Sequence, residues 1–366
     1  MSMADPNTSY LLTLEDFGEF YNYNDFNTTY ELDENTLTCN ISPISSGVTV
    51  FLCALYVLIL LLAIPGNLVV GLVITSSKQP LSPSDLYLLH LVVADFLLAL
   101  TLPFMAASVT MGWVFGDAMC KLVSIFQEVS FYASILFLTC ISVDRYLVIM
   151  RAMEASKASH RREVSWSTCA TVWLVGGLLS LPGLFNHAFL SPDTERVTCA
   201  ESYDPGSAEV WRLVIRVLGH MLGFLLPLTV MVVCYGVIVA RLLRTRGGFQ
   251  RKRTMRVIVA LVVAFLLCWM PYHLAVMADT LIRAKVVGYG CRERSAVDRA
   301  MFATQCLGLL HSCVNPVLYA FVGEKFRSRL LHILQKSGVM EQRASLTRAS
   351  RSMSQTSEAT STLMWS

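Results

Sequence analysis

The first 77 residues of this chain contain no lysine or arginine. A cleavable secretory signal needs a basic start followed by an apolar run, and residues 1–44 have neither, so we predict no such signal. Charge is scarce throughout: 15% of the residues are charged and 54% are hydrophobic, which argues against an ordinary soluble domain of 366 residues. No nucleophile, base and orienting group occur together and no metal-ligand spacing is present, so we expect neither an enzyme nor a nucleic-acid-binding protein.

The apolar residues gather into seven blocks, each long enough to cross about 30 Å of hydrocarbon. We therefore predict an all-α membrane protein with a bundle of seven transmembrane helices in residues 45–322, the first of which also serves as the targeting signal. The predicted spans are residues 48–74, 85–111, 121–146, 164–185, 210–243, 255–281 and 300–322.

The basic residues of the connections predict the orientation, because lysine and arginine in short loops are retained on the cytoplasmic side. With the N-terminus outside, the inner connections hold thirteen lysines and arginines and the outer ones hold six. We therefore place the N-terminus outside and the C-terminus inside. Glycosylation sequons agree with this, since all three lie in the outer N-terminal segment, at Asn7, Asn27 and Asn40.

The eleven cysteines fall into two groups. Seven lie within predicted spans, where a thiol behaves as a small apolar side chain. The other four lie outside, in an oxidising compartment, so two disulfides are expected among three open pairings. These four are Cys39, Cys120, Cys199 and Cys291.

Asp95 lies in the middle of the second predicted span, in "LVVADFLLAL". An aspartate there costs about 2.5 to 3.5 kcal/mol on insertion scales, so something must compensate it. Candidate partners can share a hydrogen-bond network or a small cation with Asp95, and they are Asn67, Ser134, Ser312 and Asn315. Simple packing between helices is the alternative. We favour a functional network, because an ionisable group inside a membrane is usually functional.

Prolines lie in four of the later predicted spans, where each removes a backbone donor and is expected to kink the helix. They are Pro182, Pro227, Pro271 and Pro316. Pro271 follows Trp269 in "CWMP", so a bulky ring lies beside a candidate hinge.

The third predicted span ends in "DRYLVIM", residues 144–150. Arg145 can pair there with Asp144, or its side chain can extend to the membrane interface. The third inner loop has seven basic residues and no acid between 241 and 256, which suits topogenic charge or contacts with anionic lipid.

Five motifs occur in order along the spans: "PGN", "LVVAD", "DRY", "CWMP" and "NPVLY". Together they resemble a rhodopsin-class G-protein-coupled receptor over residues 45–335. Finer features resemble chemokine receptors and, among them, the CXC receptors of the interleukin-8 type; they include "TLP", "WVFG", "ISVDRYLVI" and "LLHSCVNPVLYAFVGEKFR". That resemblance implies two disulfides, Cys120 with Cys199 and Cys39 with Cys291.

The resemblance also gives the N-terminal segment a function. Chemokines are mostly basic, and the family captures them with an acidic, tyrosine-rich N-terminus; residues 1–44 hold eight acids and four tyrosines. The negative electrostatic field of such a segment raises the rate at which a basic chemokine encounters the receptor, and salt should weaken this effect. The implied contacts are Glu15, Asp16, Glu19, Tyr21, Tyr23 and Asp25. A solvated tail that only carries glycans is the alternative.

Within the bundle, the resemblance implies ligand contacts on the fifth and sixth spans and in the third outer loop. They are Arg212, Arg216, Asp279, Arg283 and Arg294. Ordinary interfacial charge is the alternative for all five, and it competes most strongly for Arg283 and Arg294. Most chemokine receptors have a glutamate in the last span where this chain has Gln305, so a charge often used to hold the ligand amine is absent.

Activation in such receptors swings the sixth helix outward about Trp269 and Pro271, which frees Arg145 to meet Tyr235, Tyr319 and a G-protein helix. The agonist achieves this by binding the open state more tightly. Inhibitory G proteins, a rise in calcium and neutrophil migration are implied. The other residues assigned to coupling are Asp95, Asp144, Tyr146, Asn315 and Pro316. The only cofactor we expect is an allosteric sodium ion, for which the candidate ligands are Asp95, Ser134 and Asn315.

The C-terminal region has two parts. Residues 323–336, "GEKFRSRLLHILQK", are amphipathic and predict an eighth helix on the inner membrane surface. Residues 337–366 form a tail in which eleven of the last 22 residues are Ser or Thr, so phosphorylation by receptor kinases could create an arrestin-binding segment. Dimerisation is left open by the sequence.

Two other functions are alternatives to a signalling receptor in the plasma membrane: a scavenging chemokine receptor and a transporter. A scavenging chemokine receptor would internalise ligand without G-protein coupling, and such receptors usually have an altered "DRY" motif, which is nearly intact here. A transporter would show paired repeat halves and broken helices, which seven dissimilar spans do not suggest.

Overall fold

The computed structural model of the chain describes residues 46–76, 80–151, 158–191, 196–204, 206–244, 249–284, 286, 290–322, 328, 330 and 331. The acidic N-terminal segment 1–44, with its sequons and its predicted ligand contacts, lies outside these residues. So does the tail 337–366. Only three residues of the predicted eighth helix, 323–336, are described, so that helix and the inside or outside placement of the termini stay predictions.

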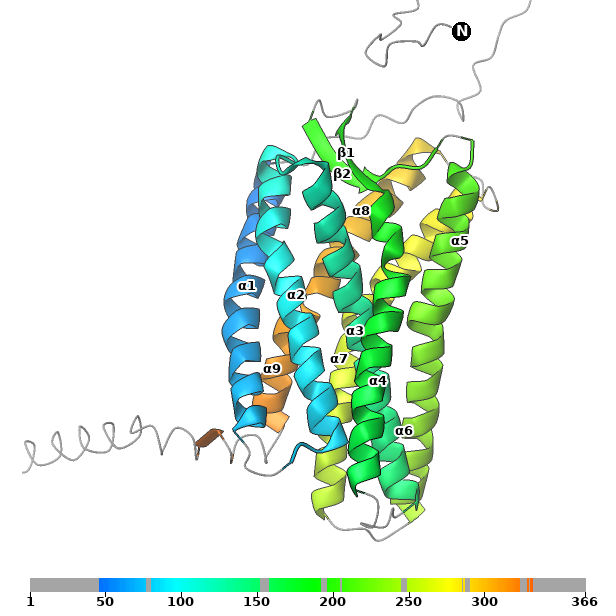
Figure 1. Cartoon of the computed structure of the whole chain (residues 1–366). Helices are drawn as coiled ribbons and strands as arrows, with labels where there is room; N and C mark the ends of the chain where they lie inside the picture. Colours follow the sequence, from blue (N-terminus) through cyan, green and yellow to red (C-terminus); the bar gives the residue numbers. More distant parts are fainter. Residues whose placement is uncertain are drawn as a thin grey trace, which may run out of the picture. The chain divides into compact units, whose positions relative to one another are not determined.

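The described chain is predominantly helical, as the long apolar runs predict. The helices form one bundle in which α1, α2 and α3 lie beside one another in sequence order and α9 returns to pack against α1 (Figure 1). Their bounds are α1 Ser46–Thr75, α2 Pro83–Met111, α3 Gly116–Arg151, α4 Ala158–Leu179, α5 Ala208–His220, α6 Leu226–Arg244, α7 Phe249–Arg283, α8 Cys291–Leu309 and α9 His311–Val322.

Six segments of the described chain are long and apolar enough to cross a membrane. They correspond to the first six predicted spans, with α5 and α6 joined through a π turn, Met221–Leu225, into the fifth. Most of them begin or end several residues beyond the apolar blocks, because a helix continues into its polar flanks.

The seventh predicted span, 300–322, is helical in the structure but interrupted at one residue. The structure divides it into α8 and α9 with a turn at Leu310. Beside the turn, Ser312 Oγ donates at 3.0 Å to Leu309 O, the carbonyl that the Cys313 amide would use in a continuous helix, and that amide donates to Leu310 O instead, at 3.1 Å. Such local bonds compete with the helical ladder.

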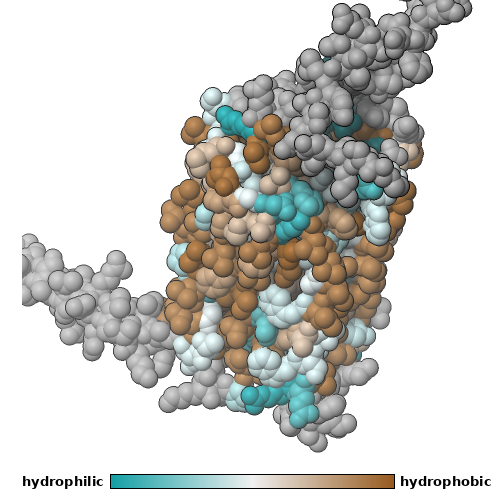
Figure 2. Space-filling model, turned by 45° about the horizontal axis from the view of Figure 1, so that its top comes forward, coloured by the Kyte–Doolittle hydropathy of each residue, from teal (hydrophilic) through white to brown (hydrophobic). Residues whose placement is uncertain are grey.

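The outer face of the bundle is apolar and the inside is packed around α3. Figure 2 shows hydrophobic side chains covering most of the visible wall, with hydrophilic ones gathered towards the ends. Inside, α3 contacts α2, α4, α6 and α7, while α1 contacts α2 and α9. An apolar exterior is what hydrocarbon as a solvent requires, because lipid does not penalise exposed leucine or valine.

A short β-hairpin, which the sequence analysis did not predict, lies at one end of the helical bundle. Strand β1, Asn186–Ser191, pairs antiparallel with β2, Arg196–Glu201 (Figure 1). A disulfide between Cys120 at the start of α3 and Cys199 in β2 ties the hairpin down, and the Trp113 amide donates to Val197 O at 2.7 Å. We call this the hairpin end. For the second implied disulfide, Cys39 and the side chain of Cys291 lie outside the description.

The four prolines do not act alike. Pro182 lies in a 3-10 turn, Leu181–Phe185, after α4 has ended, so it terminates a helix and does not kink one. Pro227 follows the π turn at the second residue of α6, whereas Pro271 and Pro316 lie inside α7 and α9. Because proline lacks the N–H that an α-helix needs, an interior proline leaves an acceptor unpaired and weakens the helix there.

The π turn lets α3 approach the fifth span closely. A Cβ added at Gly223 would lie 2.2 Å from Cε1 of Tyr132, and one at Gly219 would lie 3.1 Å from the same residue's hydroxyl. The tyrosine ring therefore rests on backbone that only glycine leaves open.

Replacing Gly223 with alanine should destabilise the bundle, because the new methyl group must displace the ring of Tyr132. Overpacking of this kind costs about 1–3 kcal/mol. We expect a lower thermal unfolding midpoint for the purified Gly223→Ala protein in detergent. Gly236→Ala on α6 is the matched control: its Cβ meets nothing within 4 Å, and a helical Gly→Ala change is neutral or stabilising. Equal loss in both variants would contradict this account of the contact.

Candidate functional site

Three charged side chains converge at the hairpin end, where the fifth and sixth spans meet. Arg216 on α5 donates from Nη1 to Asp279 Oδ2 on α7 at 2.5 Å, and Arg283 donates from Nε to the same oxygen at 2.8 Å. The Asp279 side chain is only 2% exposed, against 15% and 31% for the two arginines. Two arginines therefore share one buried carboxylate, and the three side chains together keep a net positive charge.

A second pair lies beside the first and connects it to the hairpin. Arg212, one helical turn before Arg216, approaches Glu201 of β2 with 3.5 Å between Nε and Oε2. Its guanidinium also lies 5.5 Å from the centre of the Tyr203 ring. Burial, reinforced by the Glu201 carboxylate, raises the pKa of the Tyr203 phenol to about 12, so this hydroxyl stays protonated at neutral pH.

Two acids join this region that the sequence analysis did not single out. Asp298 on α8 is half-buried and lies within electrostatic reach of Asp279, Arg283 and Arg294. Glu128 on α3 lies within reach of Glu201. An acid in the middle of an apolar block was the signal for Glu128, the same signal that identified Asp95.

Two further residues predicted as ligand contacts lie on α8. The side chains of Arg294 and Gln305 are both half-buried. The structure thus gathers the predicted arginines and Asp279 at one end of the bundle, together with the acids Glu201 and Asp298, which were not predicted.

Asp95 is fully inside the bundle, and its compensation comes mainly from α9. The carboxylate is 1% exposed, and Oδ2 accepts a hydrogen bond from Asn315 Nδ2 at 2.9 Å. Asn67 does not bond it; its Nδ2 donates to Ala63 O at 3.0 Å and to Ser312 O at 2.8 Å. Of the four candidate partners, Asn315 alone makes a direct hydrogen bond to Asp95 in the described chain.

The sequence analysis missed the second partner, His311. Its Nε2 lies 3.4 Å from Asp95 Oδ1, and both groups are 1% exposed. Its Nδ1 lies 3.1 Å from the indole N–H of Trp269 and 2.7 Å from Gly308 O. Nε2 approaches the carboxylate without forming a hydrogen bond of normal geometry, so His311 lies between Trp269 and Asp95 and contacts both.

Asp95 and two of its candidate partners have buried oxygens of the kind that a small hard cation prefers. Ser134 Oγ, Asn67 Oδ1 and Asp95 Oδ1 are all buried, and none accepts or donates a hydrogen bond within the described residues. Carboxylate, amide and hydroxyl oxygens are the donor types that hard cations prefer. The residues therefore fit the sodium site considered from the sequence, with His311 as a competing partner for the same carboxylate oxygen.

At the opposite end of the bundle, Asp144 holds α2 and α3 together. Ser84 Oγ donates to Asp144 Oδ2 at 2.5 Å, and Arg145 Nε lies 3.9 Å from the same oxygen. Ser142 Oγ donates to the Tyr235 hydroxyl at 3.0 Å, which connects α3 to α6. Arg145 is therefore not paired tightly here, and its Nε is buried without a hydrogen bond among the described groups.

The remaining predicted coupling residues are placed as follows. Tyr146 is half-buried on α3, and Pro316 packs so closely against α1 that a Cβ at Gly66 would lie 2.9 Å from its Cβ. This contact explains the glycine of "PGN". Tyr319 belongs to α9, but its side chain is outside the description.

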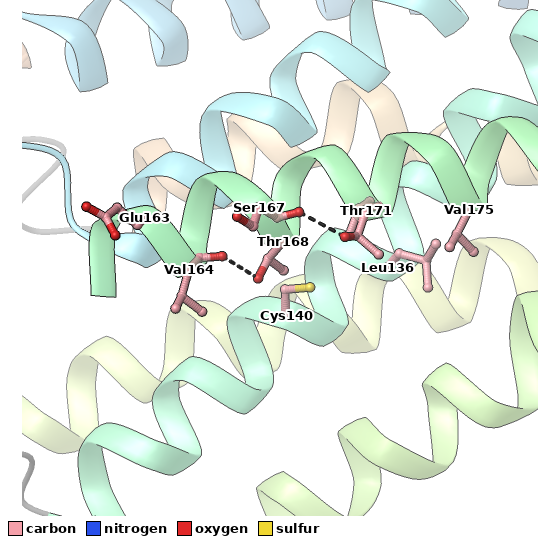
Figure 3. Close-up of a pocket in the computed structure, with 9 residues that line it drawn as sticks. Leu136, Cys140, Glu163, Val164, Ser167, Thr168, Thr171 and Val175 are labelled. Atoms are coloured by element: carbon pink, nitrogen blue, oxygen red, sulfur yellow. Dashed lines mark hydrogen bonds between the residues drawn. The ribbon is translucent and has the colours of Figure 1, made fainter. Parts of the chain in front are cut away.

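A separate pocket of about 570 Å³ lies between α3 and α4 (Figure 3). Its lining is largely apolar, with Glu163 at one end and Leu136 and Val175 at the other. The hydroxyls of Thr168 and Thr171 in its wall donate to carbonyls of their own helix. None of the predicted ligand-binding or coupling residues lines this pocket.

Asp279→Asn should destabilise the protein strongly, because it leaves Arg216 and Arg283 without their shared anion. Breaking a buried ion pair costs at least about 3 kcal/mol. Glu201→Gln is the control, since its more exposed pair with Arg212 is worth less than about 1 kcal/mol. We expect a clearly lower unfolding midpoint for Asp279→Asn and a small change for Glu201→Gln. Similar midpoints for the two variants would show that burial does not set the strength of these pairs.

Known proteins are similar to this chain over most of the bundle. The family described as "7 transmembrane receptor (rhodopsin family)" matches residues 66–319. The C-X-C chemokine receptor type 1 of Oryctolagus cuniculus is 44% identical over 286 residues, covering 78% of this chain and 79% of the relative. The human type 2 receptor is 44% identical over 290 residues, covering 79% of each. The human type 1 receptor is 42% identical over 325 residues, covering 88% and 91%.

These similarities extend over the helices that carry the Asp279 group, Asp95 and Arg145, and they agree with the motifs and with the bundle. A receptor of this family is not an enzyme. The chain belongs to the rhodopsin family of seven-transmembrane receptors and, within that family, to the CXC chemokine receptors.

Proposed function

We propose that this protein is a plasma-membrane receptor for basic CXC chemokines of the Glu-Leu-Arg type and activates inhibitory G proteins. The observation that carries the proposal is the group formed by Arg216, Asp279 and Arg283. Two arginines share one carboxylate there, so positive charge remains to receive an acidic group of a ligand. The printed names of the relatives, C-X-C chemokine receptors types 1 and 2, support the ligand class.

A Glu-Leu-Arg segment needs a site with both signs of charge. Its glutamate would meet Arg216 or Arg283, and its arginine would meet Asp298 or Glu201. Both of these acids are only partly buried, so they can form new pairs without a large desolvation cost. The acidic N-terminal segment would capture the basic body of the chemokine before its end reaches the bundle.

Coupling would occur at the opposite end, through Arg145. A loosely held arginine and the Ser142–Tyr235 hydrogen bond lie where α3 meets α6, so moving α6 or α7 would change the partners of both. Ligand binding would shift the population towards the state in which Arg145 meets a G-protein helix. Calcium release and neutrophil migration would follow, and phosphorylation of the tail by receptor kinases would recruit arrestin.

Calcium release and inhibition of cyclic AMP should respond to Glu-Leu-Arg chemokines in cells that express this chain. A panel with and without that motif, measured alongside ligand uptake, tests both ligand class and coupling. Arg145→Ala should abolish the second-messenger response and retain surface binding, because Arg145 lies at the opposite end from the ligand group. Uptake without any such response would identify a scavenging receptor and overturn the proposed coupling.

We also propose that Asp95, Ser134 and Asn315 hold an allosteric sodium ion. The buried, unpaired oxygens of this group support it. Sodium chloride should therefore raise the unfolding midpoint of the purified receptor above its value in N-methylglucamine chloride at equal ionic strength. Asp95→Asn should abolish the difference between the two salts. If the salts act alike on the unchanged protein, Asp95 is compensated by His311 and Asn315 without a cation.

A further inference from the structure

Two histidines face each other across the fifth and sixth spans. His220 is the last residue of α5, directly before the π turn, and His273 lies two residues after Pro271 in α7. Their Nδ1 atoms are 2.8 Å apart and their ring centres 4.9 Å apart. Neither residue belongs to the charged group described above or to the Asp95 network.

Aromatic rings and one charged group surround the pair. The ring of His273 stacks on Phe224 of the π turn, with centres 4.0 Å apart, and lies 5.4 Å from Phe131 of α3. His273 is 8% exposed. Arg216, one turn before His220, belongs to the net positive group with Asp279 and Arg283 and lies within electrostatic reach of His220, so a metal ion must bind beside a cation.

Both imidazoles also have a nitrogen that the described protein does not satisfy. The Nε2 atoms of His220 and His273 are buried and make no hydrogen bond within the described chain. Buried polar atoms of this kind are ordinarily met by water. The two Nε2 atoms therefore have room in their hydrogen bonding for solvent, whereas the two Nδ1 atoms face each other.

We propose that His220 and His273 form a zinc-binding site that bridges the fifth and sixth spans. Imidazole nitrogen is a preferred zinc ligand, with Zn–N distances of about 2.0–2.1 Å. In a tetrahedral centre two such nitrogens lie roughly 3.3 Å apart, so the present pair needs to open by only about half an ångström. In binding, both Nδ1 lone pairs go to the metal and each ring carries its proton on Nε2.

The remaining coordination positions would be filled by water. The described residues contain no group of three or more His, Cys, Asp and Glu side chains arranged to hold a metal. A centre with two protein ligands and two waters binds more weakly than a structural site with four, so we expect affinity in the micromolar range. A site of this affinity suits a zinc ion that binds reversibly and regulates the protein, and not one that stays bound as part of the fold.

Bound zinc would hold the helix end before the π turn against α7. The bridge joins the two elements one turn below the Arg216–Asp279 pair and one turn above Trp269 on α7. If the proposed signalling mechanism holds, movement of α7 requires this bridge to break, and zinc should lower the potency of an agonist.

Titration of the purified full-length receptor with zinc chloride tests the site directly. Calorimetry should give one bound zinc for the unchanged protein, and His220→Gln and His273→Asn should each weaken binding by about tenfold or more. Both replacements keep a polar side chain and a hydrogen-bond partner while removing the ligand nitrogen. Zinc should also raise the thermal unfolding midpoint, and magnesium, which prefers oxygen ligands, should not.

The matched control is His187→Asn, because His187 Nδ1 lies 3.1 Å from Asp117 at the hairpin end and forms a more exposed candidate site. Zinc binding that persists in His220→Gln and His273→Asn but disappears in His187→Asn would overturn the proposal, as would no binding at all. In cells, zinc should reduce chemokine potency in the unchanged receptor alone. A receptor that fails to signal would defeat the proposed function, while calorimetry would still decide the metal site.

Discussion

The burial of the Asp95 carboxylate is the constraint on which the middle of this receptor depends. A charge at the centre of an apolar bundle is tolerated only when neighbouring helices supply donors. Asn315 of α9 supplies one here, while His311 of α9 lies 3.4 Å from the other carboxylate oxygen and in turn contacts Trp269 of α7. The second, sixth and seventh spans are therefore fixed by one electrostatic requirement, and a displacement of any of them changes the cost of that charge.

At the hairpin end a buried carboxylate, Asp279, also needs donors from neighbouring helices, but its donors are partly exposed. Asp279 is as deeply buried as a core residue, yet its arginines are partly exposed, so their charges remain available to a ligand. The disulfide from Cys120 to Cys199 holds β2 where Glu201 reaches Arg212. The protein thus combines a rigid outer frame with a set of exchangeable ion pairs.

Much of the fold could be predicted from the sequence, because hydrocarbon demands long apolar helices and tolerates few charges. Six of the seven predicted spans agree with helical segments of the structure. The interruption of the last one could not be predicted, since it involves a local side-chain bond of Ser312 and a shifted Cys313 amide bond that no hydropathy pattern records. The hairpin was missed because its strands are short and its position depends on a disulfide.

Some residues of the candidate site could be predicted from the sequence and others could not. Residues whose charge is anomalous in an apolar run, such as Asp95 and Asp279, could be identified one at a time. His311 and Glu128 carried the same signal and were missed. Their importance is pairwise, because it comes from what they face on other helices, and one sequence contains no information on which helices become neighbours.

The π turn between α5 and α6 has a consequence for how such a receptor can evolve. It contains one residue more than an α-helix would place there, as the Leu226 amide bonds back to Met221. Losing that residue would rotate all of α5 by about 100° relative to α6. Arg212, Arg216 and His220 would then leave their partners while Tyr235 stayed in place. A single deletion would thus break the contacts of three α5 side chains at the hairpin end and leave the Ser142–Tyr235 contact at the other end unaltered.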